Sequence, residues 1–179
     1  ETTIEKTIRS VKKQSFKNHE LIVVDDGSTD QSYSLIKGLQ KTYSFKILRQ
    51  ENQGQGAARN KGIKSANGLY ICFLDADDIW DKNRLTILSK YIRGNDTDMF
   101  CNDEVIWLGK DRFSYLRNRF PTNSKDLLLK GNYLSPSAIC IKAELFNKVG
   151  YFNEDRELIG VEDFDLWIRI FMNNIMFYE

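Results

Sequence analysis

The stretch "YICFLDADDIW", residues 70–80, places a group of carboxylates directly after an apolar run. Its first five residues are apolar or aromatic and predict a strand that is buried on both faces. Asp75, Asp77 and Asp78 follow at once. Because burying an unpaired anion is costly, such residues need a cation, a positive partner or open water. The end of this strand is therefore a candidate binding site.

Outward from this stretch, strands and helices alternate as far as residue 102. The patterns predict further strands at 19–26, 45–50 and 97–103, and helices at 2–16, 27–43, 54–68 and 81–93. This alternation indicates an α/β fold of parallel strands with right-handed crossovers. Ligands bind at the carboxyl ends of the strands in such sheets. We therefore expect Asp25–Asp26 and Asp75–Asp78 to line one rim.

The pattern is looser after residue 102. It predicts strands at 104–109 and 137–141, and helices at 124–131, 142–150 and 161–174. A chain of 179 residues is long enough for one domain with a sizeable core. We predict a single domain with two functional halves, about 1–102 and about 103–179.

Composition narrows the classes of partner and location. Lys and Arg total 26 against 25 Asp and Glu, which argues against a dedicated nucleic-acid binder. Three widely spaced cysteines indicate reduced, buried thiols in a cytosolic protein. No apolar run approaches the roughly 20 residues that span a bilayer.

Asp75 and Asp77 are the candidate metal ligands. On an extended chain residues two apart project to the same side, and paired carboxylates suit a hard divalent cation that shares phosphate oxygens. The alternative is a solvated turn that caps the helix beginning near Asp81.

Two glycine-containing loops are candidate nucleotide contacts. In "VVDDGSTD" a carboxylate could face ribose or a base, although the same residues form ordinary turns and caps. In "NQGQGAARN" backbone amides and Arg59 could bind a diphosphate. A turn with a surface arginine is the alternative for that loop.

The run "GVEDFDLWIRI" supplies the candidate proton acceptor. Glu162 and Asp163 begin an amphipathic helix, where acidic residues also occur for dipole reasons alone. With His19 the only histidine, any acid–base chemistry depends on carboxylates. We expect the helix amides to favour the charged form of Asp163 and so to lower its basicity.

The run "RFSYLRNRF", residues 112–120, interleaves arginines with aromatic residues. Contact with nucleic acid or a membrane surface is one interpretation. An amphipathic or lid segment is the other, and the pattern favours it.

Five motifs in order resemble the family 2 glycosyltransferases of the GT-A fold: "TIEKTIRSVKKQSFKNHELIVVDDGSTD", "NQGQGAARNKGI", "GLYICFLDADDIW", "KVGYFNED" and "VEDFDLWIR". The resemblance implies a Rossmann-like, mostly parallel sheet flanked by helices. It also implies inverting transfer of a sugar from a nucleotide-diphosphate donor, UDP being favoured, to a glycan or lipid-linked acceptor. The first half would bind the nucleotide sugar and the second the acceptor, in the cytoplasm with peripheral contact at the inner face of the membrane.

The resemblance also assigns roles to residues. Asp26 matches the carboxylate that holds the base and ribose, and Arg59 matches the basic nucleotide contact. Asp75 and Asp77 match the D-x-D motif that binds Mg²⁺ or Mn²⁺, with Asp77 the direct ligand. Asp163 matches the catalytic base, and Glu162 lies beside it at the acceptor.

The sequence departs from the family pattern at both ends. The family's opening strand is missing before Glu1, so we expect a truncated fold with a gap in the sheet. The Gln-x-x-Arg-Trp element of processive synthases is also not found. Two rivals stay open, a nucleotidyltransferase that makes sugar nucleotides and, more remotely, a phospho-accepting receiver domain.

Overall fold

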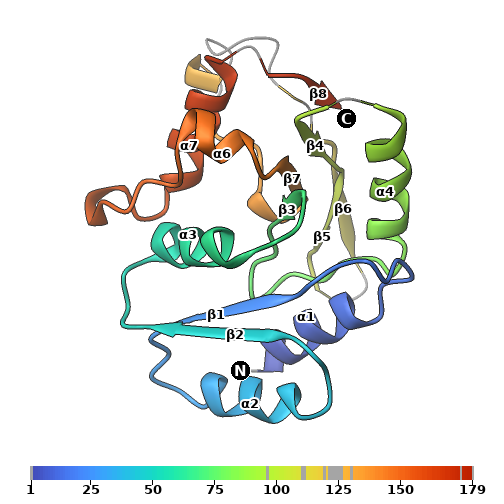
Figure 1. Cartoon of the computed structure of the whole chain (residues 1–179), viewed down its shortest axis with the longest axis vertical. Coiled ribbons are helices and arrows are strands. Elements are labelled where there is room, and N and C mark those ends of the chain that lie inside the picture. Colours follow the sequence, from blue (N-terminus) through green and yellow to red (C-terminus); the bar gives the residue numbers. More distant parts are fainter. Residues whose placement is uncertain are drawn as a thin grey trace.

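The computed structural model describes residues 2–95, 97–109, 112–118, 120, 127–129, 131–173 and 175–178. Within these ranges the chain forms the predicted α/β architecture, with helices packed around three small groups of strands (Figure 1).

The first group is a parallel pair of strands covered by two helices. Its elements are α1 (Thr2–Lys12), β1 (Ile22–Asp26), α2 (Ser32–Gln40) and β2 (Lys46–Gln50). The register pairs Val24 with Leu48 and Asp26 with Gln50. Alternate residues of β1 are buried, and Val23 packs with Ile8 of α1 and Ile36 of α2 in a separate small core. This packing fixes the direction in which β1 delivers Asp26.

The second group is a four-stranded sheet in the order β3-β7-β4-β8. Its strands and the two helices that precede β3 and β4 are α3 (Gln55–Ser65), β3 (Tyr70–Cys72), α4 (Arg84–Gly94), β4 (Met99–Cys101), β7 (Ile139–Lys142) and β8 (Phe177–Tyr178). β7 runs antiparallel to both β3 and β4. β3 and β4 therefore point the same way, and their carboxyl ends lie at one edge.

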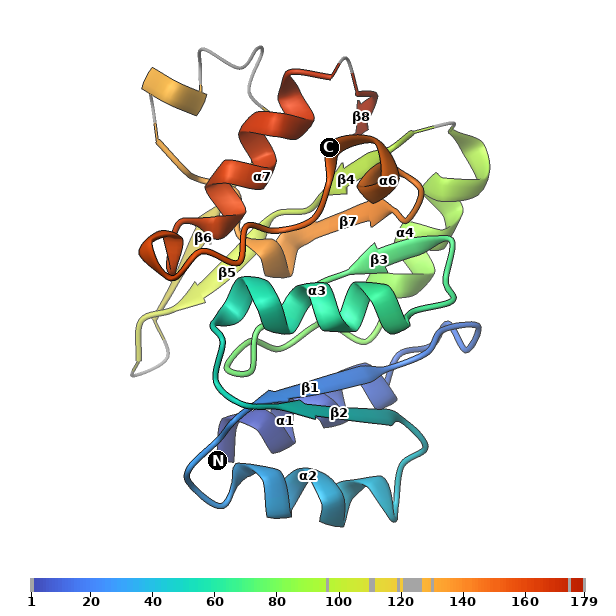
Figure 2. The same cartoon turned by 60° about the vertical axis from the view of Figure 1, so that its left-hand side comes forward.

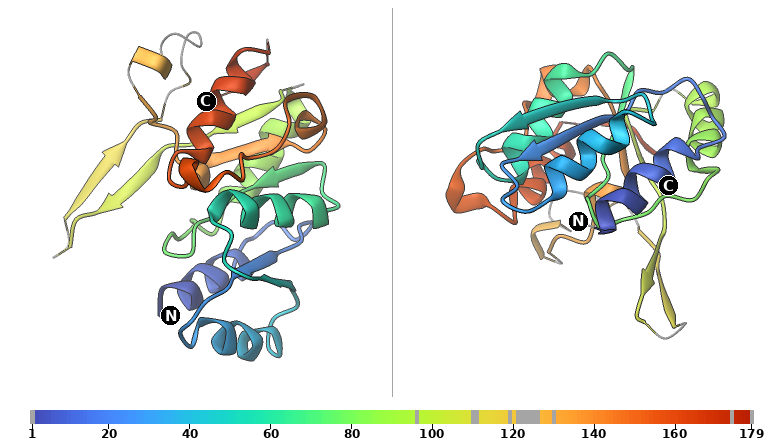
Figure 3. Two further views of the ribbon diagram at one scale, coloured as in Figure 1. Left: turned by 90° about the vertical axis from the view of Figure 1, so that its left-hand side faces the viewer. Right: turned by 90° about the horizontal axis from the view of Figure 1, so that it is seen from below.

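The remaining elements lie around this edge and over the sheet. They are the antiparallel hairpin β5 (Glu104–Trp107) and β6 (Phe113–Leu116), then η1 (Pro136–Ala138), α6 (Leu145–Val149), η2 (Arg156–Leu158) and α7 (Glu162–Phe171). Trp167 of α7 is fully buried in the larger core. The hairpin projects away from the body of the molecule, as Figures 2 and 3 show from several sides.

Two predictions about local structure need correction. β3 ends at Cys72, and residues 75–78 form a turn in which the Asp78 amide donates to the Asp75 carbonyl at 3.1 Å. Asp75 and Asp77 are therefore not on extended chain. The Phe73 ring, which continues the apolar run beyond β3, packs against Phe146 and Phe152 at 6.4 and 5.3 Å between centroids. Burial of that side chain, rather than strand pairing, explains the apolar run.

Within the segment 112–120, residues 113–116 form β6, a strand of the hairpin. The helix predicted at 124–131 lies partly outside the described residues, and 127–129 are helical.

β1 and β3 are not paired with each other. These strands belong to different sheets, and a cavity of about 1470 Å³ lies between them. Apolar side chains from α1, α3 and α4 line its walls, among them Ile8, Ile63 and Leu88, and its rim includes Asp26, Arg59 and Asp75. The predicted rim thus holds residues from the ends of both strands.

Candidate active site

The first turns of α3 and the loop before it contact residues at the end of β1 and after β3. The carboxylate of Asp26 accepts hydrogen bonds from the backbone amides of Gln53 and Gly54 and from Gln50 Nε2, at 2.8 to 2.9 Å. These bonds hold the loop before α3 against β1. Gly54 has φ 93°, a conformation that favours glycine. The predicted nucleotide carboxylate therefore also shapes the loop beside it.

Asp25 has a different role from Asp26. Its side chain is fully buried, and Arg49 Nε lies 3.0 Å from Oδ2. The guanidinium of Arg49 also lies over the Tyr33 ring at 4.0 Å. Asp25 is thus occupied by an internal ion pair, whereas Asp26 reaches the rim.

Arg59, on the second turn of α3, contacts carboxylates from both halves of the chain. Its Nη2 donates to Asp75 Oδ1 at 2.9 Å, and its Nη1 donates to Glu162 Oε1 at 2.6 Å. The side chains of Arg59 and Glu162 are 12% and 4% exposed, so this ion pair is shielded from solvent. Glu162 Oε2 also accepts from the amide of Gly160 at 2.7 Å. Three of the predicted site residues therefore form one cluster.

The turn at residues 75–78 presents Asp77 to solvent. The Asp75 amide donates to Ser137 Oγ at 3.0 Å, which anchors the turn to η1. Among the described residues, none donates a hydrogen bond to the carboxylate of Asp77. In the same ranges no cluster of three or more metal-ligating side chains occurs. Carboxylate oxygen is a ligand type that Mg²⁺ or Mn²⁺ takes together with water and phosphate, so the exposed Asp77 fits such an ion, whereas Asp75 Oδ1 already accepts from Arg59.

Asp163 lies at the start of α7 and is partly buried. Asn132 Nδ2 donates to its Oδ2 at 2.9 Å, and the Phe164 amide donates to Oδ1 at 2.7 Å. Burial raises the pKa of Asp163 above its ordinary value, and the bond from Asn132 opposes that rise. The expectation that its basicity is lowered is therefore wrong. Desolvation of the carboxylate outweighs the donors around it.

Close packing of α3 against the segment before α7 holds these groups together. Asn60 is buried, donates to the Phe152 carbonyl at 2.8 Å and accepts from the Phe152 amide at 2.9 Å. A Cβ on Gly56 would lie 2.5 Å from the Asn153 carbonyl oxygen and 3.3 Å from Glu162 Cγ. Only glycine permits this approach, which brings Arg59 within reach of Glu162.

Three polar residues of the site were not predicted: Asn60, Asn132 and Ser137. Asn60 follows Arg59 in the quoted motif, and its place on α3 was the only sequence signal. Asn132 and Ser137 come from the loosely patterned second half, in which no periodicity singles them out. Each acts by a hydrogen bond to a residue far away in the sequence.

Other residues that the sequence singled out lie elsewhere or in the core. His19 precedes β1, at the end away from Asp26, and its Nδ1 lies 2.8 Å from the Phe16 carbonyl. Cys72, Cys101 and Cys140 are free thiols in the four-stranded sheet, and only Cys72 is partly exposed.

Comparison with known proteins assigns the family. The profile "Glycosyl transferase family 2" matches residues 1–155. The chain belongs to glycosyl transferase family 2. This membership decides against the nucleotidyltransferase and receiver-domain alternatives.

Individual relatives of this glycosyl transferase family 2 chain show the same relationship. The UDP-Glc:alpha-D-GlcNAc-diphosphoundecaprenol beta-1,3-glucosyltransferase WfgD of Escherichia coli is 30% identical over 97% of the chain and 66% of its own length. The cholesterol galactosyltransferase of Borreliella burgdorferi is 27% identical over 97% of the chain and 45% of its own length. The chain thus spans at most 66% of the length of these relatives.

Solved structures support the GT-A fold. Residues 1–349 of Staphylococcus aureus TarS, in complex with UDP, are 26% identical, with a TM-score of 0.73 over 98% of this chain and 53% of that chain. The mannosyltransferase PcManGT from Pyrobaculum calidifontis, in complex with GDP-Man and Mn²⁺, has a TM-score of 0.73 at 18% identity, over 98% of this chain and 50% of its own. Within the described ranges of the present chain, no helix has both the length and the apolar character needed to cross a bilayer.

Proposed function

We propose that this family member transfers a sugar from a nucleotide-diphosphate donor to a hydroxyl group of a glycan or lipid-linked saccharide. UDP is the favoured nucleotide, since the Escherichia coli relative is named for UDP-Glc and TarS was solved with UDP. The lipid-linked acceptor is supported by the name of the Escherichia coli relative, which contains a diphosphoundecaprenol saccharide, and the name of the Borreliella relative contains a membrane lipid, cholesterol.

The contact of Arg59 with both Asp75 and Glu162 is the observation that carries the proposal. Asp75 belongs to the D-x-D turn after β3, and Glu162 adjoins the candidate base on α7. The guanidinium of Arg59 therefore contacts both the proposed donor side and the proposed acceptor side of the rim. A site that joins two substrates needs this proximity, because holding reactants together removes much of the entropic cost of their encounter.

On the donor side, we assign Asp26, Arg59, Asp75 and Asp77 to the nucleotide diphosphate and its ion. Asp77, with Asp75 beside it, would hold Mg²⁺ or Mn²⁺. When bound, the ion would supply Lewis-acid stabilisation of charge on the diphosphate. Asp26 would act on the base and ribose partly through the loop 51–54, whose amides it holds.

On the acceptor side, Asp163 takes the proton of the acceptor hydroxyl. The hydroxyl oxygen attacks the anomeric carbon as the bond from that carbon to the diphosphate oxygen breaks, and the diphosphate leaves with the bonding electrons. Attack from the face opposite the diphosphate inverts the configuration. A raised pKa makes Asp163 a better proton acceptor than an ordinary aspartate, since efficient bases have a pKa closer to the working pH.

We place the reaction in the cytoplasm, at the inner face of the membrane, as part of the same proposal. A membrane-linked acceptor requires that the rim reach a lipid surface.

Glu162 would not take the proton itself, because its two oxygens already accept bonds from Arg59 and Gly160.

A panel of sugar nucleotides tests the donor assignment. The melting temperature of the intact protein should rise when a UDP-sugar is added and rise further when Mn²⁺ is added, because a ligand that binds only the folded state stabilises it. Radiolabelled transfer from the best donor to lipid-linked saccharides then tests the reaction. If no nucleotide sugar raises the melting temperature with or without metal, the proposed function is wrong.

A further inference from the structure

The β5–β6 hairpin has one face made entirely of large apolar side chains. The register places Val105 opposite Tyr115 and Trp107 opposite Phe113. Because alternate residues of a strand point to the same side, these four share a face. Their exposed fractions are 58%, 79%, 60% and 52%, and the Trp107 and Phe113 rings contact edge to face at 4.8 Å.

Large apolar side chains are unusual on an exposed hairpin. A two-stranded hairpin is at best marginally stable alone in water, and this one projects beyond the body of the molecule (Figures 2 and 3). Leu108 in the turn is a further exposed apolar residue. A contiguous exposed patch of this kind marks an interaction surface.

The hairpin starts at the same edge of the sheet as the candidate active site. β4 ends at Cys101, three residues before β5, and β4 points the same way as β3. Ile79 in the loop after β3, and Ile159 and Val161 before α7, are also exposed. Exposed apolar side chains therefore occur in two loops next to candidate site residues as well as in the hairpin.

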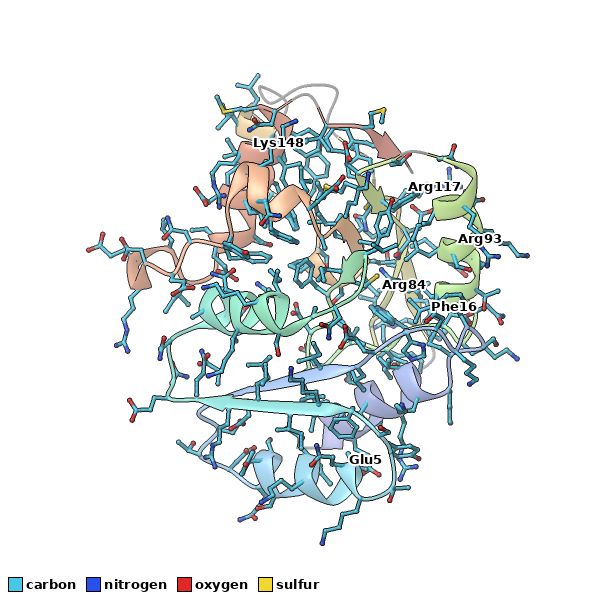
Figure 4. The ribbon with its side chains drawn as sticks, viewed as in Figure 1. Glu5, Phe16, Arg84, Arg93, Arg117 and Lys148 are labelled. Atoms are coloured by element: carbon cyan, nitrogen blue, oxygen red, sulfur yellow. The ribbon has the colours of Figure 1, made fainter. Side chains whose placement is uncertain are left out.

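Charge indicates what kind of partner the hairpin meets. From the first residue of β5 to the third residue after β6, residues 104–119 include four basic residues and two acidic residues. The side chains of Arg112 and Arg117 are exposed at the two ends of β6, and Figure 4 labels Arg117. Aromatic side chains combined with arginines suit the headgroup region of an anionic bilayer, which attracts both.

We propose that the β5–β6 hairpin docks this glycosyltransferase onto anionic membranes, with Trp107, Phe113 and Tyr115 inserted at headgroup depth. The docking itself depends on the hairpin alone. Its consequence, that the rim of the site faces a lipid-linked acceptor, rests on the proposed function.

Vesicle flotation tests the docking. The intact protein should float with vesicles of phosphatidylglycerol and phosphatidylethanolamine, and much less with phosphatidylcholine alone. Trp107→Ser combined with Tyr115→Ser should lower the association by roughly tenfold or more, because binding scales with inserted apolar area. Met172→Ser is the matched control: this side chain is 69% exposed at the end of α7 away from Asp163, and its loss should change nothing.

Tryptophan fluorescence gives a second readout that does not depend on the double variant. Emission should shift to the blue on adding anionic vesicles, and Trp107→Phe should remove the shift while flotation continues. Failure of the parent protein to float, equal flotation of the double variant, or equal binding to both kinds of vesicle would overturn the proposal.

Two further outcomes separate this surface from its competitors and from the reaction. If the double substitution converts a dimer to a monomer in sedimentation, the face is an interface between copies, and the membrane proposal is wrong. If the protein docks as proposed but transfers no sugar, the proposed function fails while the docking stands.

Discussion

Arg59 of α3 and Glu162 of α7, which are 103 positions apart in the sequence, form a buried ion pair with Nη1 2.6 Å from Oε1. Arg59→Met should lower the free energy of unfolding by about 3 kcal/mol, because it leaves the Glu162 carboxylate buried with only the Gly160 amide. Urea denaturation measures this loss. Donor binding should weaken as well, since Arg59 also contacts Asp75.

Arg9→Met is the matched control for that substitution. Arg9 pairs with Glu5 at 2.7 Å on the exposed face of α1, where the two side chains are 45% and 36% exposed (Glu5 is labelled in Figure 4). An exposed pair of this spacing contributes little to stability, because water and salt screen it. Equal losses in the two variants would mean that the Arg59 pair does not join the halves of the site.

Gly56 should tolerate no side chain, although it lies within a helix. A Cβ there would meet the Asn153 carbonyl oxygen at 2.5 Å, so Gly56→Ala must push α3 away from the segment before α7. We expect a loss of about 1–3 kcal/mol in thermal or urea unfolding, together with weaker donor binding.

Gly62→Ala, on the same helix, provides the comparison. Its Cβ would lie 3.5 Å from Val24 Cγ2, an ordinary contact, and alanine is the better helix former. This variant should be as stable as the parent or more stable by about 0.5–1 kcal/mol. A stable Gly56→Ala variant with normal donor affinity would show that the close approach is not needed.

Asp77→Asn should abolish the enhancement of donor binding by Mn²⁺ and leave the melting temperature of the free protein almost unchanged. The carboxylate is exposed, so the fold loses little, whereas an amide is a poor ligand for a hard cation. Titration calorimetry with and without Mn²⁺ measures the effect. Glu144→Gln removes an exposed carboxylate beside Lys142 at the far end of β7 and should change neither quantity. Unchanged metal dependence in Asp77→Asn would refute the assignment.

The rim of the site could be predicted from sequence because it depends on strand direction. The alternation of strands and helices places Asp26 and Asp75 after separate strands, and both residues line the cavity that lies between the two sheets. The length of β3 could not be predicted. Phe73 continues the apolar run, but its ring packs against aromatic rings and the residue is not part of the strand. An apolar run indicates that its side chains are buried, but it does not determine whether the backbone forms a strand.

The contacts that organise the site lie beyond what periodicity encodes. Arg59 and Glu162 were each identified, but nothing in the sequence paired them over 103 residues. The Asn132–Asp163 hydrogen bond depends on a loop with no pattern of its own. The pKa of Asp163 was expected to move the wrong way, because its burial by tertiary packing is invisible in sequence.

Asn132→Ala should lower kcat by about tenfold with little change in donor affinity, because the Asp163 carboxylate loses the hydrogen bond that holds it in position. The bond from Asn132 lowers the pKa of Asp163, so its loss should move the acid limb of the pH–kcat profile to higher pH. Asn95→Ala, which removes a local bond to the Tyr91 carbonyl on α4, should leave the profile in place. A fall in kcat without movement of the limb would indicate a merely structural role.

Asp163→Asn should stabilise the fold at neutral pH. Because burial raises the pKa of Asp163 in the folded state, the charged carboxylate costs stability above that pKa, and the cost disappears as pH falls below the ordinary value. The amide carries no such cost. Melting temperatures of the two proteins should therefore differ at pH 7 and converge in acid. An acidic residue that serves only the helix dipole predicts the opposite, a loss of roughly 0.3–1 kcal/mol at pH 7.

The turnover number of Asp163→Asn tests the central claim most directly. With donor and acceptor saturating, kcat should fall by roughly 100-fold or more while calorimetry gives an unchanged donor affinity, because only proton removal in the transition state is lost. The residual product should keep the inverted anomeric configuration. Near-normal turnover by this variant would contradict the account.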